Sequence, residues 1–291
     1  MRCNIILLDL NQVMIANMMK HIAVSGEEFS EDLVRHMVLN SIRSYKTKFG
    51  AKYGEMVICC DDRDYWRKGV FPYYKAHRKQ DREKSTIDWS KVFNCLNKIR
   101  EELKEFFPYR VIQVEHAEAD DIIGTLTTRF GVWLNNDDSE RILILSGDKD
   151  FGQLQKFSNV DQFSPITKKN ITIKDPRRFL REHIMRGDRG DGIPNFLSPD
   201  GCIVANERQK PLQTKKLDIW IDQEPEQFCN EMMLRNYRRN EQLVDLDCVP
   251  TDIVDQINAE FDNYDVPEKR GLLNYFIKNK LKNLVEYIGD F

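Results

Sequence analysis

The chain has 291 residues, of which 41% are hydrophobic, 10% aromatic and 31% charged, and its net charge at pH 7 is −3. This composition supports a folded core in one large domain, with or without an appendage, and excludes binding to nucleic acid through a global excess of basic charge. The seven cysteines form no C-x-x-C motif and predict reduced thiols in a cytosolic protein, and no apolar stretch is long enough to predict a membrane span.

Short apolar runs alternate with helical patterns through the first two-thirds of the chain. Buried strands are predicted at NIILL (4–8), MVICC (56–60), RVIQV (110–114) and RILIL (141–145). Helices are predicted from the cap Ser30 to about Gly50 with Leu33, Met37, Val38 and Ile42 on one face, at about 88–107, and at about 118–130 followed by Gly131. From about residue 175 the patterns are helical. The sequence therefore predicts an α/β fold, with a mainly parallel sheet flanked by helices and a smaller helical C-terminal region.

Carboxylates follow each predicted strand. They are Asp9, then Asp61 and Asp62, then Glu118, Asp120 and Asp121 in EHAEADDIIG, and finally Asp148 and Asp150 in SGDKD. Ligands of an open parallel sheet bind in the crevice beyond the carboxyl ends of its strands. Oxygen ligands suit Mg²⁺ or Mn²⁺, so we expect these acids to hold metal at one edge of the sheet.

Simpler interpretations exist for single residues of this set. An Asp after a strand is often a helix cap or a turn residue, and we expect Asp62 and Asp121 to be solvated or capping. His116 is expected to be structural. The spacing of Cys and His does not favour a zinc site.

Residues 63–84, RDYWRKGVFPYYKAHRKQDREK, carry eight Lys/Arg and three acids interleaved with five aromatic residues. Cations for phosphates and rings for bases are typical of binding to single-stranded nucleic acid, whereas a solvated basic helix with aromatics in the core is the alternative. The stretch directly follows Asp61, so we expect it to overhang the acidic crevice and favour phosphodiester chemistry. With only Val70 as an aliphatic anchor, it is expected to be mobile.

Six motifs, LLDLNQ, CCDDRDYWR, PYYKAHR, EADDIIG, SGDKDFGQL and MRGDRGDGIPN, occur in the order found in the structure-specific 5′-nuclease (flap endonuclease) family. The chain resembles that family over essentially its whole length, and its spacing and C-terminal third are most similar to the T-even phage ribonuclease H branch. The resemblance implies a PIN/5′-nuclease-like fold, in which residues 63–84 form a helical arch.

The resemblance also implies two Mg²⁺ ions, for which Mn²⁺ can substitute. The implied ligands are Asp9, Asp61, Glu118, Asp120 and Asp148 for the first ion, and Asp150, Asp188 and Asp191 for the second, and Asp148 is the candidate to be shared between them. In the arch, Lys75 and Arg78 match catalytic residues that contact the scissile phosphate, Tyr74 matches an aromatic that stacks on a nucleotide, and Arg67 matches a basic position at the base of the arch.

GDRGDGIPN matches the opening of the family's helix-three-turn-helix, which holds duplex by its backbone. The chain then departs from the family pattern with FLSPDGCIVANERQKPLQTKKLDIW, which leaves duplex grip and a bound monovalent ion open. Lys210, Lys215 and Lys216 are expected either to meet phosphates or to be ordinary surface lysines. We expect a nuclease domain over residues 1–185, including the arch, and a helical duplex-binding region over residues 186–291.

These features predict a metal-dependent 5′→3′ exonuclease with ribonuclease H and flap endonuclease activity. The expected substrates are forked, flapped or nicked duplex DNA and RNA–DNA hybrid, and the expected role is removal of RNA primers during phage-type replication. The resemblance implies a monomer in the host-cell cytoplasm, acting with a single-stranded-DNA-binding protein and a sliding clamp. The alternatives are a non-catalytic protein that binds branched DNA and a small-molecule phosphatase, and the sequence favours neither because the acids are many and the arch is basic.

Overall fold

The computed structural model describes residues 4–25, 30–133 and 140–291, and for residues 20–25 it describes the backbone alone. Six strands form one sheet in the order β3-β2-β1-β4-β5-β6, which is parallel except for the edge strand β6. The strands are β1 (Ile5–Asp9), β2 (Glu55–Cys59), β3 (Arg110–Ile112), β4 (Ile142–Leu145), β5 (Val160–Ser164) and β6 (Lys169–Ile171). The predicted α/β fold with a mainly parallel sheet is confirmed.

The four predicted strands are neighbours in the sheet, from the edge strand β3 to β4, and β5 and β6 extend it beyond β4 without having been predicted. The β5 sequence VDQFS contains Asp161 and Gln162, so it lacks the continuous apolar run that indicated the other four. Gln162 is buried and donates from Nε2 to the carbonyls of Ser146 and Asp148. These partners lie in another segment of the chain, so the sequence of β5 alone did not indicate a buried strand.

Helices connect the first four strands along the chain, and further helices follow the last strand. They are α1 (Leu10–Ser25), α2 (Glu31–Tyr53), α3 (Trp66–Val70), α4 (His77–Glu83), α5 (Trp89–Phe106), α6 (Ala119–Phe130), α7 (Pro176–Arg186), α8 (Thr214–Trp220), α9 (Pro225–Phe228), α10 (Glu231–Val244), α11 (Thr251–Asn263), α12 (Leu272–Lys278) and α13 (Lys282–Val285). Helices α5 and α6 begin and end where the sequence predicted, and α2 has the predicted cap Ser30. However, α2 continues to Tyr53, and Leu33 on its predicted apolar face is 40% exposed. Helix α1 was not predicted. None of the helices described is long and apolar enough to span a membrane.

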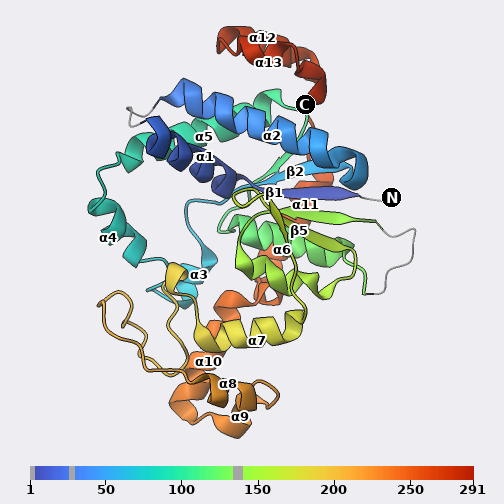
Figure 1. Cartoon of the computed structure of the whole chain (residues 1–291). Coiled ribbons are helices and arrows are strands. Elements are labelled where there is room, and N and C mark those ends of the chain that lie inside the picture. Colours follow the sequence, from blue (N-terminus) through green and yellow to red (C-terminus); the bar gives the residue numbers. More distant parts are fainter. Residues whose placement is uncertain (1–3, 26–29, 134–139) are drawn as a thin grey trace.

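Helices cover both faces of the sheet (Figure 1). On one face, Ile6 and Leu8 of β1 pack in a cluster with α1, α2 and α5. On the other face, Ile5 and Leu7 of the same strand pack with α6 and α11. Successive side chains of a strand point to opposite faces of the sheet. A strand covered by helices on both faces therefore needs apolar residues at every position.

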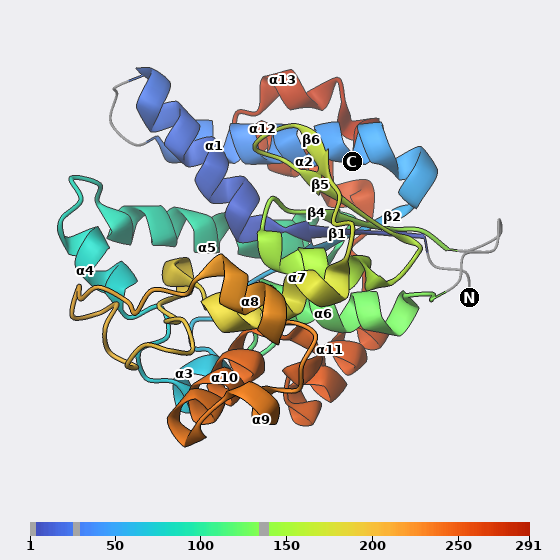
Figure 2. The ribbon, with the colours of Figure 1, turned by 60° about the horizontal axis from the view of Figure 1, so that its bottom comes forward.

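The C-terminal third contributes to three hydrophobic clusters. Helices α7, α8 and α10 form a cluster of their own that also takes in Phe71 and Tyr74. Helix α11 lies against α6 (Figure 2), whereas α12 and α13 lie on the opposite side of the sheet with α2 and α5. The division into residues 1–185 and 186–291 stays a prediction.

Candidate active site

The carboxyl ends of the central strands open into a cavity of about 1130 Å³. Five of the predicted metal ligands line it, namely Asp9, Asp61, Asp120, Asp148 and Asp191. The first four come from β1, from the segments that follow β2 and β4, and from the first turn of α6. Basic side chains line the same cavity, and they are Arg63, Lys68, Lys75, Arg78, Arg82 and Arg100. The structure thus brings together the predicted acids with cations of the arch.

Burial and mutual repulsion make these acids costly to ionise. Burial, then the charge of Asp61, raises the pKa of Asp9 to about 7. Burial and the charge of Asp148 likewise raise the pKa of Asp120 well above its usual value. Two neutral side chains hold the set in place: Ser146 Oγ donates to Asp9 Oδ2 at 3.1 Å, and Asn11 Nδ2 donates to Asp61 Oδ2 at 2.5 Å. A divalent cation would relieve this repulsion, so the acids fit a hard metal ion.

Glu118 is 1% exposed and is the centre of a buried polar network. Its Oε1 accepts from Lys75 Nζ at 2.5 Å, and its Oε2 accepts from Tyr74 Oη at 2.7 Å. Arg67 Nη1 lies 3.1 Å from the same Oε2. Burial opposes ionisation of Glu118, yet the charges of Lys75 and Arg67 lower its pKa. The role of Glu118 as a metal ligand stays a prediction.

Two arch residues whose roles the resemblance implied are buried in this structure. Tyr74 is 3% exposed, with its hydroxyl bonded to Glu118 and 3.1 Å from Asp191 Oδ2, and its stacking on a nucleotide stays a prediction. Arg67 is 2% exposed and binds Glu118, Asp121 and the carbonyl of Leu243, so it is a buried cation at the base of the arch. The exposed ring of the YY pair is Tyr73.

The arch is anchored at its base by side-chain packing and a backbone hydrogen bond, and its mobility stays a prediction. Phe71 and Tyr74 pack in the cluster of α7, α8 and α10, whereas α4 buries no residue. The backbone N–H of Lys75 donates to the carbonyl of Asp191 at 2.7 Å. A Cβ on Gly192 (φ +76°) would lie 2.8 Å from the carbonyl of Tyr73, so this close approach requires glycine.

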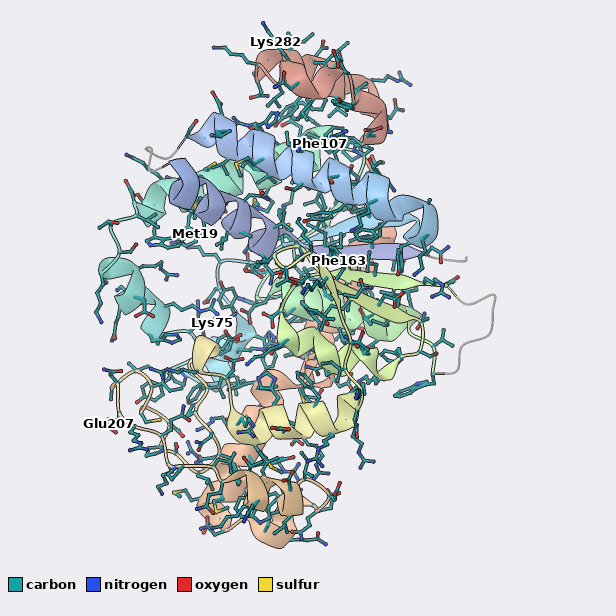
Figure 3. The ribbon with its side chains drawn as sticks, viewed as in Figure 1. Met19, Lys75, Phe107, Phe163, Glu207 and Lys282 are labelled. Carbon is teal, nitrogen blue, oxygen red and sulfur yellow. The ribbon has the colours of Figure 1, made fainter. Side chains whose placement is uncertain are left out.

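Lys75 and Arg78 hold the arch against the 188–191 turn. Lys75 has a φ of +53°, which is a strained conformation for a residue with a Cβ. Its Nζ lies 3.7 Å from Asp191 Oδ2, and Arg78 Nη2 lies 2.6 Å from Asp191 Oδ1. Figure 3 shows Lys75 where the arch meets the segment that follows α7. Both predicted cations therefore reach the acidic cavity.

The other predicted acids lie in a second group beside the cavity. Asp150 and Asp188 are joined there by His183, which sequence analysis missed, and one ligand atom from each lies within 4.8 Å of the others. Burial raises the pKa of Asp150 to about 7 despite the nearby His183. Burial opposes the charged form of His183, yet the hydrogen bond with Asp188 and the charge of Asp150 raise its pKa. The only sequence signal for His183 was its place five residues before Asp188.

The remaining predicted residues have simpler settings. Asp121 accepts from the backbone N–H of Glu118 at 2.9 Å within the capping box of α6, in agreement with the expected capping role. Asp62 accepts from the backbone N–H of His116 at 3.0 Å and so joins two loops, which was not predicted. The His116 side chain is exposed. Lys210, Lys215 and Lys216 are exposed, and their contact with phosphates stays a prediction.

Comparisons with known sequences cover nearly the whole chain. The model of the 5′-3′ exonuclease N-terminal resolvase-like domain matches residues 12–183, and that of the T4 RNase H C-terminal domain matches residues 179–291. Ribonuclease H of Enterobacteria phage T4 is 32% identical over 297 residues, which cover 99% of this chain and 95% of that protein. Flap endonuclease Xni of Shewanella pealeana is 34% identical over 137 residues, which cover 44% of this chain and 48% of the relative.

Solved structures have the same fold. The D15 protein of T5, crystallised with metal ions, superposes with a TM-score of 0.62 at 18% identity, covering 89% of this chain and 98% of that one. The bacteriophage T5 D15 flap endonuclease in a complex with DNA and metal ions superposes with a TM-score of 0.61 at 16% identity over the same shares.

Proposed function

Because the chain belongs to the 5′-3′ exonuclease and flap endonuclease family, and is therefore a nuclease, we propose that it is a metal-dependent 5′→3′ exonuclease with ribonuclease H and flap endonuclease activity. It hydrolyses phosphodiesters near the 5′ end of RNA or DNA strands paired to DNA. Its proposed role is removal of RNA primers from lagging-strand fragments during phage-type replication.

One observation carries this proposal: carboxylates from the strand ends and basic side chains from the arch line the same cavity. The carboxylates alone would repel a phosphodiester, and a pure DNA-binding protein gains nothing from placing them there. With divalent cations on the acids, the same cavity attracts phosphate.

The proposed ligands of the first ion are Asp9, Asp61, Asp120 and Asp148, with Glu118 beside them, and those of the second are Asp150, Asp188 and Asp191. Two Mg²⁺ ions, or Mn²⁺ in their place, would supply a water of lowered pKa and stabilise the leaving 3′-oxygen. The buried, unpartnered Oδ1 of Asp150 is an atom that such an ion would satisfy.

The residues of the chain orient the phosphate and balance its charge. Lys75 and Arg78 pair with Glu118 and Asp191 in this structure, so both cations are fixed within reach of the acids. A phosphate entering the cavity takes these cations as partners, and they then stabilise charge that gathers on its nonbridging oxygens. The cut leaves a 5′-phosphate.

The protein is proposed to hold its substrate through contacts with the sugar–phosphate backbone of the nucleic acid. The exposed lysines at positions 210, 215 and 216 contact duplex phosphates, which carry no sequence information, so RNA and DNA strands are both accepted. A related T5 flap endonuclease has been solved with DNA. A single-stranded-DNA-binding protein and a sliding clamp are the proposed protein partners, and a monomer in the host-cell cytoplasm is the proposed active form.

The test is a time course on 5′-labelled nicked, flapped and RNA-primed duplexes with Mg²⁺ and with EDTA. We expect cleavage that requires Mg²⁺ or Mn²⁺ and yields 5′-phosphorylated products. Asp61→Asn should abolish it, whereas Asp64→Asn should not, because the Asp64 side chain is exposed and pairs with Lys68. Cleavage that persists in EDTA would contradict the proposal.

A further inference from the structure

His183 lies in the last turn of α7, where it faces two acids. Its Nε2 is 3.3 Å from Asp188 Oδ2, and its Nδ1 is 3.4 Å from Asp150 Oδ1. The turn that returns the chain from α7 to Asp188 uses Gly187 at φ +65°, where a Cβ would lie 2.4 Å from the carbonyl of Ile193. Glycine is therefore needed to bring Asp188 beside the imidazole.

His183 Nδ1 and Asp150 Oδ1 are buried and face each other, but they form no hydrogen bond with each other or with any other described atom. His183 is 6% exposed, so water does not readily satisfy its nitrogen. Phe179 packs edge-on against the ring, with the centroids 6.0 Å apart, and limits its rotation. A buried polar atom that lacks a partner is uncommon in a native protein and calls for an explanation, of which an ion is one.

The contacts of Asp188 explain how the ring is oriented. Asp188 Oδ1 accepts from the backbone N–H groups of Gly190 and Asp191, which fixes the turn. Its Oδ2 faces His183 Nε2 and also lies 2.8 Å from Lys149 Nζ. With the Nε2 proton donated to Asp188, Nδ1 is the nitrogen that faces Asp150, and a cation that binds it would displace any proton that Nδ1 carries. A ligating histidine is commonly held in this way, with its other N–H on a carboxylate.

We infer that His183 Nδ1 is a nitrogen ligand of the second cation, beside Asp150 Oδ1, and that Asp188, named above among the ligands, instead holds the imidazole in place. This inference rests on the proposed function, because it concerns the second of the two proposed ions. The first set, Asp9, Asp61, Asp120 and Asp148, offers oxygen alone. Imidazole suits transition metals, whereas oxygen ligands suit Mg²⁺, so the second position should favour Mn²⁺ over Mg²⁺ more strongly than the first.

The decisive measurement is electron spin echo envelope modulation of Mn²⁺ bound to the full chain without substrate. Wild type should show coupling to an imidazole ¹⁴N, and labelling with ¹⁵N-histidine should replace it with ¹⁵N coupling. Because this pair of spectra needs no variant, it tests the inference even if a substitution at position 183 prevents folding. Spectra from fully loaded protein that lack nitrogen coupling would overturn the inference.

Substitution of single histidines identifies which residue supplies the nitrogen that couples to Mn²⁺. His183→Gln should remove the nitrogen coupling. It should also weaken the binding of Mn²⁺ at one of the two positions by on the order of tenfold, and the binding of Mg²⁺ by less. His116→Gln is the matched control, since that histidine is exposed and lies apart from Asp150, and it should leave the coupling intact. Coupling that persists in His183→Gln would overturn the inference.

The two proposals fail in different ways. If wild type cleaves a flapped duplex with Mg²⁺ but shows no nitrogen coupling, the ligand role of His183 is wrong and the nuclease function stands. If nitrogen coupling appears but no substrate is cut, the metal ligand stands and the proposed substrates are wrong.

Discussion

Replacing Arg67 with Met should destabilise the fold and should affect DNA binding little. The guanidinium is buried, where it lies 3.1 Å from Glu118 Oε2 and 2.8 Å from Asp121 Oδ1, and its Nε donates to the carbonyl of Leu243 at 2.9 Å. Methionine matches the length of the aliphatic part but supplies no charge and no donor. Two buried carboxylates and one carbonyl then lose a partner.

The size of the effect follows from what the two acids retain. Removing one partner of a buried ion pair costs about 3–5 kcal/mol. Glu118 keeps Lys75 and Tyr74, and Asp121 keeps the indole N–H of Trp66 at 3.1 Å, so the lower end applies, about 3 kcal/mol. An unfolding entropy of about 2.1 cal/mol/K per residue gives a chain of 291 residues about 0.6 kcal/mol/K, so Tm should fall by about 5 °C.

Calorimetry of wild type and Arg67→Met at one pH and salt concentration measures this fall. Arg63→Met is the matched control: Arg63 is a nearby arginine of the same segment, but it is exposed and lines the cavity. It should leave Tm within about 1 °C, as surface substitutions do, and weaken the binding of flapped duplex. An unchanged Tm in Arg67→Met together with weakened DNA binding would refute the structural role of Arg67.

Three further predictions concern the cavity. Asp120→Asn should lower the cleavage rate at least about 100-fold, because a metal ligand is lost. Affinity for flapped duplex should stay unchanged or become tighter, since the repulsion of phosphate falls. A variant that cuts at the wild-type rate would show that Asp120 serves only in the first turn of α6. Lys75→Ala should slow single-turnover cleavage about 100-fold with a modest loss of affinity, and recovery of the full rate at saturating protein would make Lys75 an electrostatic guide. The fold raises the pKa of Asp9 and of Asp150 from 3.8 to about 7. Between these two pH values the folded state binds more protons than the unfolded state, so its stability decreases as the pH rises. In EDTA, Tm should therefore fall as the pH rises from 5 to 8. Added Mg²⁺ should reduce this fall in scanning calorimetry, and a Tm that rises through this window in EDTA would contradict the assignment.

The sequence by itself determined the central sheet and the acids at its edge. A continuous apolar run predicts a buried parallel strand, and the residue after such a strand lies at the carboxyl edge wherever the strand sits in the sheet. This local rule was enough to place Asp9, Asp61 and Asp148 around one cavity. The cap Ser30 and the boundaries of α5 and α6 were also predictable from local sequence, because helix capping depends on residues that are close together in the chain.

Only the tertiary structure decided which side chains of the arch face the cavity. Tyr73 and Tyr74 are adjacent and chemically identical, yet Tyr73 is exposed and Tyr74 is buried, because the cluster of α7, α8 and α10 covers one and leaves the other. Arg67 is buried for a similar reason, since Glu118 and Leu243 come from distant parts of the chain. His183 meets Asp150 only because α7 packs against the 3₁₀ helix at Lys149–Lys156. Burial is set by contacts between segments far apart in the sequence, and neither composition nor periodicity within one segment encodes it.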